Sequence, residues 1–381
     1  LRKPFRPEGV RAMLERLEGP VRAVLSGRNH PGFSLSRLKL ENKLLYIDQH
    51  DLRLSPTQIQ QLNAPLGAPA PSADYVDGLM AMTEGWMAGV KVALLAYARF
   101  GTVALERFNG SQPEIVDYFG HVVLKRLSPQ MHDFLLSCAL FERFDGELCD
   151  HVLERSGSAL LLEDLAAREL FMLPLAEQPG CYRYHALLHD FLAKRLSLHK
   201  PLEVLRLHGR AALVFRQRGE LEPALQHAQR CGEPALFQAL LEEACDLWVR
   251  TGHFAEVLKW LEPLSEVQLR ESPRLLVPMI LALTLSRRFH QARYCLDELA
   301  THSAGREGLE EPRRQVLALN LELFQHDLAF DPEGRWPGLL EAGVSSDTRA
   351  LHLTILAYHH LMHGRLERSI GLALEAKALL A

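Results

Sequence analysis

The second half of the chain carries a spaced pattern of small residues that restricts how it can fold. From Leu202 onward the apolar residues follow the period of an α-helix, and in several places a turn residue is followed five positions later by a packing residue. These pairs are Gly219 with Ala224, Gly252 with Val257, Arg287 with Ala292, and Gly364 with Ser369. The first three turns are spaced by about 34 residues, and the longer last interval leaves room for an irregular repeat around residues 324–340. The pattern predicts stacked pairs of helices.

A period of this length is typical of a tetratricopeptide-like helical superhelix, which we predict for residues 201–381 together with a concave surface. The alternative is a helical domain without repeats, because the matches are degenerate. Val257 is larger than the usual packing residue, and Arg287 stands where a turn glycine is expected. Both interpretations make this half of the chain helical, so the fold class is mainly α.

The composition is that of a globular protein. The 381 residues include 43 Lys and Arg against 47 Asp and Glu, and the net charge of −4 does not favour a generally basic nucleic-acid surface. The longest apolar run, Leu275–Leu285, contains Pro278 and is too short to span a bilayer, so no membrane association is expected. The 6 cysteines include no CxxC pair, which favours reduced, buried cysteines in a cytoplasmic protein.

Residues 1–54 have an α/β character that the remainder lacks. Helical spacing over Pro7–Leu17 is followed by the apolar run Val21–Ser26, which predicts a buried, parallel strand. Leu44–Ile47 predicts a second strand. Because two strands cannot form such a sheet alone, we interpret residues 1–54 as the C-terminal slice of a doubly wound α/β domain.

Residues 55–111 are expected to form a small helical domain. Ser55-Pro56 has the form of an N-cap followed by a first-turn proline, which predicts a helix start. An Ala- and Pro-rich loop over residues 63–73 separates this helix from helical spacing over Tyr75–Phe108.

Residues 112–200 combine helices with a hairpin. Several helical patterns are followed by two strand-like runs, Phe171–Glu177 and Cys181–His185, around the turn Gln178-Pro179-Gly180. A final helix is predicted over Ala186–Leu196. A hairpin behind three helices is the layout of a winged helix.

Arg28 is the first candidate ligand-binding residue. It follows the predicted strand Val21–Leu25, and ligands of open α/β sheets bind beyond the carboxyl ends of strands. An arginine there can form paired hydrogen bonds to a phosphate group. An ordinary surface arginine in a loop explains the pattern equally well.

His185 is the second candidate. It lies where a strand meets a helix, so neighbouring backbone N–H groups can help to hold an anion. A histidine buried in the core is the competing interpretation. His189 follows one helical turn later, but the glutamate of an HExxH motif is missing, and no metal site is predicted. The segment Tyr358–His360 with His363 is interpreted as the solvated face of a repeat helix.

No catalytic site is predicted in this chain. No GxSxG motif occurs, and the phosphate-binding motif GxxxxGK[ST] is absent from the sequence. Without that loop the chain is not expected to hydrolyse a nucleotide by itself. Whether a longer parent protein is a slow regulatory ATPase is left open.

The order of these segments resembles the signal-transducing NTPases with numerous domains, in particular the large ATP-binding LuxR-type transcriptional regulators. Four stretches carry the resemblance: Val24–Arg28 with Leu35–Leu38, Asp51–Ser55, Thr83–Trp86 with Gly89, and Tyr182–Leu196. They are similar to the family's sensor strand with its following helix, the entry to its helical lid, a lid helix, and the end of its winged helix. Residues 1–54 are then the C-terminal part of the NTPase domain, residues 55–111 the lid and residues 112–200 the winged helix.

The resemblance implies a regulator in which these domains clamp ADP at rest. A small-molecule inducer or a regulatory protein would bind the helical repeats, and ATP would then support self-association and promoter binding. On this chain Arg28 would face the terminal phosphate and His185 the β-phosphate. Met87 stands where many relatives have an adenine-packing proline, which puts adenine contact there in doubt.

Three expectations concern the longer parent protein. The P-loop and the Mg-binding strand would precede Leu1, and a DNA-binding helix-turn-helix would follow Ala381, so the chain is interpreted as a fragment. ADP or ATP with Mg would bind the parent, whereas the fragment is not expected to hold a nucleotide tightly. The alternative function is a tetratricopeptide-type interaction scaffold with a regulatory NTPase remnant and no role in DNA binding.

Overall fold

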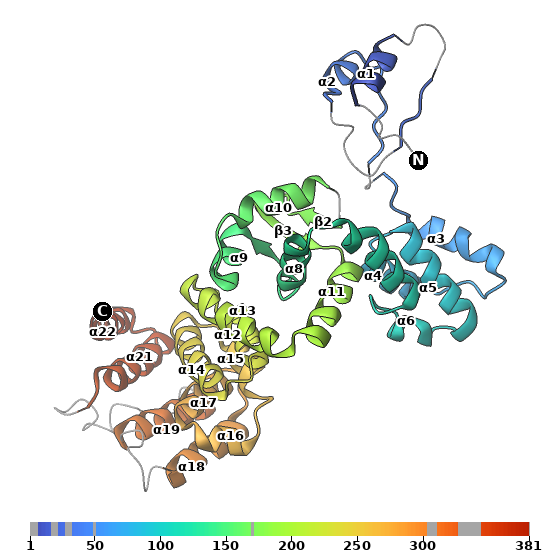
Figure 1. Cartoon of the computed structure of the whole chain (residues 1–381). Helices are drawn as coiled ribbons and strands as arrows, with labels where there is room; N and C mark the ends of the chain where they lie inside the picture. Colours follow the sequence, from blue (N-terminus) through green and yellow to red (C-terminus); the bar gives the residue numbers. More distant parts are fainter. Residues whose placement is uncertain are drawn as a thin grey trace. The chain divides into compact units, whose positions relative to one another are not determined.

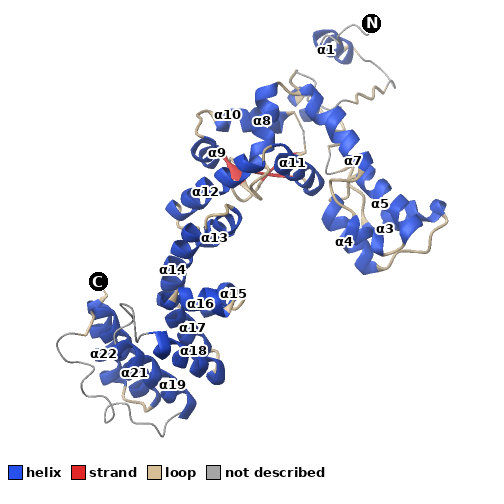
Figure 2. Ribbon diagram, turned by 60° about the horizontal axis from the view of Figure 1, so that its bottom comes forward, coloured by secondary structure: helices blue, strands red, loops and turns tan. Residues whose placement is uncertain are grey.

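A computed structural model describes residues 7–16, 22–26, 33–48, 51–168, 171–302, 311–326 and 344–380. In these ranges almost all regular structure is helical, and the strands form a single three-stranded sheet (Figures 1 and 2). The chain divides into two compact units, and each is described by itself. The first comprises Leu1–Arg218 with Arg230–Gly232, and the second Gly219–Gln229 with Glu233–Ala381.

The N-terminal segment contains helices but no strand among its described residues. Helix α1 (Pro7–Glu15) begins where predicted, and α2 (Ser36–Leu40) follows. Residues 22–26 and 43–48 belong to no sheet, and Val24 and Leu45 are 92% and 84% exposed. The strand predictions for these residues are therefore wrong in this structure. A strand requires hydrogen-bonded neighbours, and the described residues supply none for either segment.

Residues 55–111, which we call the lid, form a small helical domain. The helix start at Ser55-Pro56 is confirmed, because the Ser55 hydroxyl accepts the backbone N–H of Gln58 and the Gln58 side chain accepts the N–H of Ser55. The helices of the lid are α3 (Pro56–Asn63), the 3₁₀ turn Ala64–Leu66, α4 (Ala73–Thr83), α5 (Met87–Phe100) and α6 (Val103–Arg107).

The winged helix follows the lid and contains the sheet. Its elements are α7 (Pro113–Tyr118), a π-turn (Phe119–Val123), a 3₁₀ turn (Leu124–Arg126), α8 (Pro129–Cys138), β1 (Phe144–Asp145), α9 (Gly146–Leu153), α10 (Ser158–Ala167), β2 (Met172–Pro174), β3 (Cys181–Tyr184) and α11 (Ala186–His199). The predicted hairpin is present as the antiparallel pair β2–β3, which we call the wing. The sequence did not predict β1, a two-residue strand that pairs with the other side of β3.

Helix α12 (Pro201–Gln217) packs against α9, and two arginines bind the two ends of α9. Arg218, just after α12, donates to both carboxylate oxygens of Asp145, at 2.8 and 3.0 Å, and Asp145 also caps the start of α9. Arg210 reaches the other end of α9, where it contacts the Val152 carbonyl at 3.3 Å and the Glu154 carboxylate at 2.7 Å. This helix therefore belongs to the same unit as the winged helix.

The second unit is a series of helices. They are α13 (Leu221–Arg230), α14 (Pro234–Thr251), α15 (Phe254–Leu261), α16 (Glu266–Glu271), α17 (Pro273–Leu285), α18 (Phe289–His302), α19 (Glu311–His326), α21 (Ser346–Met362) and α22 (Leu366–Leu379). Neighbours in this series pack against one another, as α17 does with α18 and α21 with α22. The irregular repeat expected around residues 324–340 lies largely outside the described residues.

The turn residues named from the sequence share one backbone conformation. Gly219, Gly252, Arg287 and Gly364 have φ of 76°, 80°, 60° and 72°, which lies in the left-handed region. The partners five positions later are buried: Ala224, Val257 and Ala292 are 0% exposed, and Ser369 is 8% exposed. Arg287 thus adopts the glycine conformation at a cost of about 1–2 kcal/mol. The turn and packing positions are confirmed at these four places.

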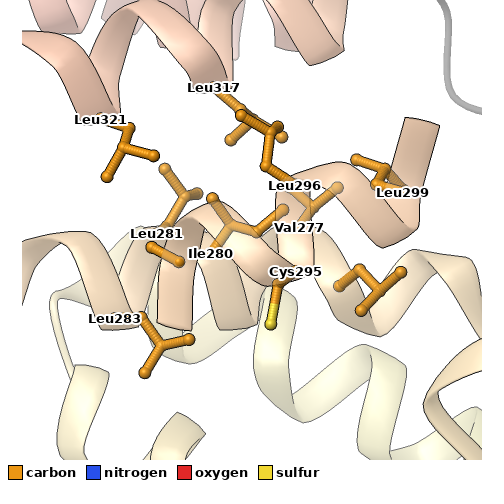
Figure 3. Packing of buried hydrophobic residues seen from close by; sticks show 11 residues of the cluster. Val277, Ile280, Leu281, Leu283, Cys295, Leu296, Leu299, Leu317 and Leu321 are labelled. Carbon is orange, nitrogen blue, oxygen red and sulfur yellow. The ribbon is translucent and has the colours of Figure 1, made fainter. Parts of the chain in front are cut away.

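Leucine-rich packing holds the middle of the second unit together. Figure 3 shows side chains of α17, α18 and α19 directed toward one another, including Ile280, Leu296 and Leu317, which are 0%, 4% and 0% exposed. The only polar atom among the side chains of this cluster is the thiol sulfur of Cys295.

The solvated face predicted for Tyr358–His360 with His363 is present only in part. Tyr358, at 37%, and His363 are exposed, but His359 and His360 are 6% and 1% exposed, so the prediction is wrong for these two histidines. Helix α21 packs against both α19 and α22, which cover part of its surface. The cysteine prediction is confirmed: all are free, and only Cys181 is not fully buried. Among the described residues no helix has the length and apolarity needed to cross a membrane.

Candidate functional site

Two backbone corners meet where the lid contacts the winged helix. The first is the turn between α4 and α5, which contains Glu84 at φ 47° and Gly85 at φ 74°. A Cβ on Gly85 would lie 2.8 Å from the Leu54 carbonyl oxygen, so only glycine fits against the chain that enters the lid. The Leu54 N–H donates to the Gly85 carbonyl at 2.9 Å and fixes this contact.

The second corner joins β3 to α11. Side chains alternate along β3, so Tyr182 and Tyr184 point into the winged-helix core at 8% and 3% exposure, and Arg183 points the other way, toward the lid. His185 is the N-cap of α11, and its own N–H donates to the Phe171 carbonyl at 2.8 Å. We call the contact of the two corners the lid–wing junction.

His185 is buried at the junction and has partners on both ring nitrogens. Its Nε2 lies 2.8 Å from the Thr83 carbonyl oxygen, and its Nδ1 accepts the Leu187 N–H at 3.3 Å. A nitrogen that accepts from a backbone N–H carries no proton, so Nε2 is the donor to Thr83. Burial lowers the pKa of His185 although Glu84 and the Thr83 carbonyl act in the opposite direction. The ring is therefore neutral at pH 7 and links wing to lid.

Glu84 is the centre of the charged contacts. Its two carboxylate oxygens accept from Nη1 and Nη2 of Arg183 at 2.7 and 2.9 Å, and one of them also accepts the Ala186 N–H at 3.2 Å. Arg53 approaches the same carboxylate, with Nη2 at 3.7 Å. Burial acts to raise the pKa of Glu84, but the hydrogen bonds from Arg183 and the surrounding charges outweigh it and lower that pKa. Glu84 is therefore ionised at neutral pH.

An aromatic cluster surrounds these polar contacts. The Trp86 ring centroid lies 5.0 Å from those of Tyr118 and Phe171, 5.6 Å from that of Phe119 and 6.0 Å from that of His185. Phe171, like Glu84, has a positive φ, of 58°. Strained residues of this kind persist only where the surrounding structure holds them, and here two meet at one contact.

The structure brings together two motifs that the sequence indicated separately. Thr83–Trp86 and His185 lie in direct contact. Arg28 lies outside the described residues, so its predicted role stays a prediction. The role predicted for His185 also stays a prediction. The Nε2 of His189 is buried and has no hydrogen-bond partner. The described part of the chain contains no group of three or more His, Cys, Asp or Glu side chains suited to a metal ion.

Sequence reasoning missed the Glu84 contacts with Arg183 and Arg53. Glu84 stood inside a motif quoted for its glycine, and Arg183 lay in a strand. One sequence signal was available: a glutamate directly before a glycine, at the end of a helix, occupies a position where glycine or asparagine is usual.

Comparison with known proteins gives the class of the chain. The family described as "MalT winged helix domain" matches residues 120–204. A serine/threonine-protein kinase, PknK of Mycobacterium tuberculosis, is 30% identical over 226 residues, which are 58% of this chain and 20% of that protein. MalT of Vibrio cholerae, an HTH-type transcriptional regulator, is 22% identical over 365 residues, 93% of this chain and 38% of MalT. AlkS of Pseudomonas putida, also an HTH-type transcriptional regulator, is 24% identical over 291 residues, 75% and 32% of the two chains.

The chain is thus a mainly helical protein with a winged helix domain of the MalT type. More specifically, it resembles the MalT-like LuxR-type regulators, as the sequence motifs predicted. It spans between a fifth and two fifths of the length of these relatives.

Proposed function

We propose that this chain is the central, signal-transducing region of an ATP-dependent transcriptional regulator of the MalT type. One observation carries the proposal: His185, at the corner between the wing and α11, is bonded at 2.8 Å to the Thr83 carbonyl of the lid. A histidine in this position can report on a ligand at the junction because its hydrogen bond joins two domains. The similarity to MalT and AlkS supports transcription as the output.

In this proposal ADP, held with Mg in a longer protein, is clamped at rest. His185 would exchange the Thr83 carbonyl for an oxygen of the β-phosphate and would use the same Nε2–H as donor. Arg28 would contact the terminal phosphate from the C-terminal slice of the NTPase domain. Val24, Leu25, Leu45, Tyr46 and Ile47 are exposed apolar side chains, which would be covered by other parts of that protein.

The second unit would be a tetratricopeptide-like superhelix that receives the signal. The left-handed turns and the buried packing residues after them support this assignment. Its ligand would be a small-molecule inducer or a regulatory protein. Binding would release the clamp, after which ATP supports self-association and a separate domain binds DNA. The chain itself is not expected to catalyse hydrolysis, and a cytoplasmic location follows from the role in transcription.

A second candidate is a regulatory scaffold with no role in DNA binding. The similarity to PknK favours it, since that relative is named as a kinase rather than as a transcriptional regulator. In this case the same clamp and repeats would control a different output. Reporter transcription in the presence of the longer protein separates the two, because only the first candidate changes it.

The nucleotide clamp is tested with His185→Ala in the longer protein. We expect the variant to lose bound ADP during gel filtration and to raise basal transcription without inducer. His189→Ala is the matched control, because His189 lies one turn later on α11 and its Nε2 has no hydrogen-bond partner. Unchanged ADP retention and normal induction in His185→Ala would refute the clamp.

A further inference from the structure

Glu84 holds the lid–wing junction in an unusual way. A glutamate in the left-handed region is disfavoured relative to glycine or asparagine, and both would fit the end of α4 better. The backbone thus carries a cost at the one position that supplies a carboxylate to the wing. Glu154 ends α9 in the same conformation, at φ 51°, but its side chain is 65% exposed, whereas that of Glu84 is 12% exposed. Burial of the carboxylate, and not backbone strain alone, therefore distinguishes Glu84.

The carboxylate of Glu84 has two arginines near it, and they differ in geometry. Arg183 forms a bidentate pair with hydrogen bonds of 2.7 and 2.9 Å. Arg53 stands 3.7 Å from Oε2, too far for a hydrogen bond but close enough for an ion pair. Arg183 belongs to the wing, and Arg53 belongs to the chain that enters the lid beside Gly85.

Opening of the junction breaks the bidentate pair between Glu84 and Arg183. The Glu84 side chain is only 12% exposed in the closed junction, and departure of the wing exposes its carboxylate to water, which replaces part of the lost hydrogen bonding. Arg53 replaces a further part, because a small side-chain movement turns its 3.7 Å approach into a paired contact. Arg53 stays beside Glu84 when the wing departs, since both lie in the lid contact fixed by the Leu54–Gly85 hydrogen bond.

We propose that Glu84 is a charge-exchange lock: in the closed junction it holds Arg183 of the wing, and in the open junction it pairs with Arg53. The lock gives the junction two defined states rather than one closed state and a disordered one. Arg183 favours the closed state, and Arg53 favours the open one. Glu84 and Arg53 are positioning residues, because they act through the wing rather than on a ligand.

The two arginines therefore have opposite effects. Arg183→Gln removes the closed pair and leaves the open pair intact, so opening becomes more frequent. Arg53→Gln destabilises the open state more than the closed state, because Arg53 pairs fully with Glu84 only after Arg183 has left. Opening then becomes rarer. A static network would behave differently, since loss of either arginine would weaken it.

Hydrogen exchange of the purified 381-residue chain tests the lock. Exchange is followed in two peptides, residues 83–87 and residues 183–188. The second peptide contains the amides of Ala186 and Leu187. We expect exchange there to rise about tenfold or more in Arg183→Gln, and to fall about threefold or more in Arg53→Gln. Arg183→Lys should give an intermediate rise, because lysine cannot bond both oxygens in the same way.

Arg250→Gln is the control variant. Arg250 forms an exposed ion pair with Asp246, at 2.9 Å, on α14 in the second unit. It should leave exchange at 183–188 unchanged. The proposal is overturned if Arg53→Gln speeds exchange or leaves it unaltered, or if Arg183→Gln has no effect.

The regulatory meaning of the lock rests on the proposed function, but the exchange experiment does not. The exchange experiment needs neither nucleotide nor DNA. If exchange changes as expected but transcription does not, the proposed function is rejected and the charge-exchange lock is retained. If both hold, Arg183→Gln in the longer protein raises basal transcription and Arg53→Gln lowers it. If only the lock fails, the His185→Ala result still stands on its own.

Discussion

The lid–wing junction and the α17–α19 core hold their parts together by different means. The junction combines one carboxylate, two arginines and a neutral histidine with an aromatic cluster. The core joins its helices through aliphatic side chains such as Ile280 and Leu317. Polar contacts can change partners at little net cost, whereas a close-packed apolar core cannot loosen without losing its contacts. The first region is suited to switching and the second to stability.

The largest effect is expected in the core. Ile280→Ala removes a side chain that is 0% exposed and should lower the free energy of unfolding of the second unit by about 2–5 kcal/mol. Urea denaturation followed by circular dichroism measures this loss. Val267→Ala, at a position 61% exposed, should change stability by less than about 0.5 kcal/mol. Equal losses in the two variants would contradict the central role of this packing.

A substitution at the junction should have a somewhat smaller effect. Gly85→Ala strains a left-handed residue and pushes a methyl group against the Leu54 carbonyl, so we expect a loss of about 2–3 kcal/mol. Gly67→Ala is the control, because Gly67 has a similar φ of 68° but nothing within 4 Å of the added atom. Thermal unfolding measures the stability loss of each variant, and the difference between the two losses is the contribution of the contact with the Leu54 carbonyl. If the two variants melt alike, the contact contributes nothing.

Two buried histidines, His208 and His185, sharpen the comparison. Burial lowers the pKa of His208, on α12, to about 4, and Arg230 acts in the same direction. The folded state then binds its proton less readily than the unfolded state, so stability is complete above pH 6.5 and is lost as the pH falls toward 4. The loss from His208 at pH 5 should be about 1–2 kcal/mol.

Urea titrations at pH 7.5 and pH 5 check this, with His208→Leu as the variant that lacks the proton site. The variant should lose less stability between the two pH values than the unmodified chain does. His185 is the internal contrast, because Glu84 partly offsets the effect of its burial. The same pH dependence in both proteins would show that another group is responsible.

The smallest effect is expected at a turn between repeats. Arg287 has φ 60° where the other turns have glycine, so Arg287→Gly should raise the free energy of unfolding by about 0.5–1 kcal/mol. Gly252→Ala, at φ 80°, should lower it by a comparable amount. Denaturant midpoints of the two variants should therefore move in opposite directions. A destabilised Arg287→Gly would mean that the Arg287 side chain contributes contacts that outweigh its strain.

Local rules predicted local structure well in this chain. The cap at Ser55 forms as expected, and helices α1 and α11 begin at the residues that the sequence indicated, Pro7 and Ala186. These features depend on residues a few positions apart, which the sequence displays directly. The turn at Arg287 was also located correctly, because the buried Ala292 after it was informative where the glycine was missing.

Features that depend on distant partners were not predictable in the same way. The apolar runs at residues 22–26 and 44–47 have strand character, but a strand exists only with a neighbour. His352, His359 and His360 are buried because α21 packs against α19 and α22, and the sequence of α21 alone does not show this packing. Arg183 and Glu84 are 99 positions apart, so their pairing became visible only when the lid and wing were placed together.

The contacts of Arg210 and Arg218 with α9 affect which stretch of the chain can be moved into another protein as a unit. Arg210 and Arg218 both lie beyond residue 204, where the winged-helix family match ends. A recombination event that moved only residues 120–204 into another protein would leave α9 without the partners at its two ends. A transplanted winged helix would therefore need to extend through α12 to the turn at Gly219, where the first stretch of the first unit ends, to keep both arginine contacts.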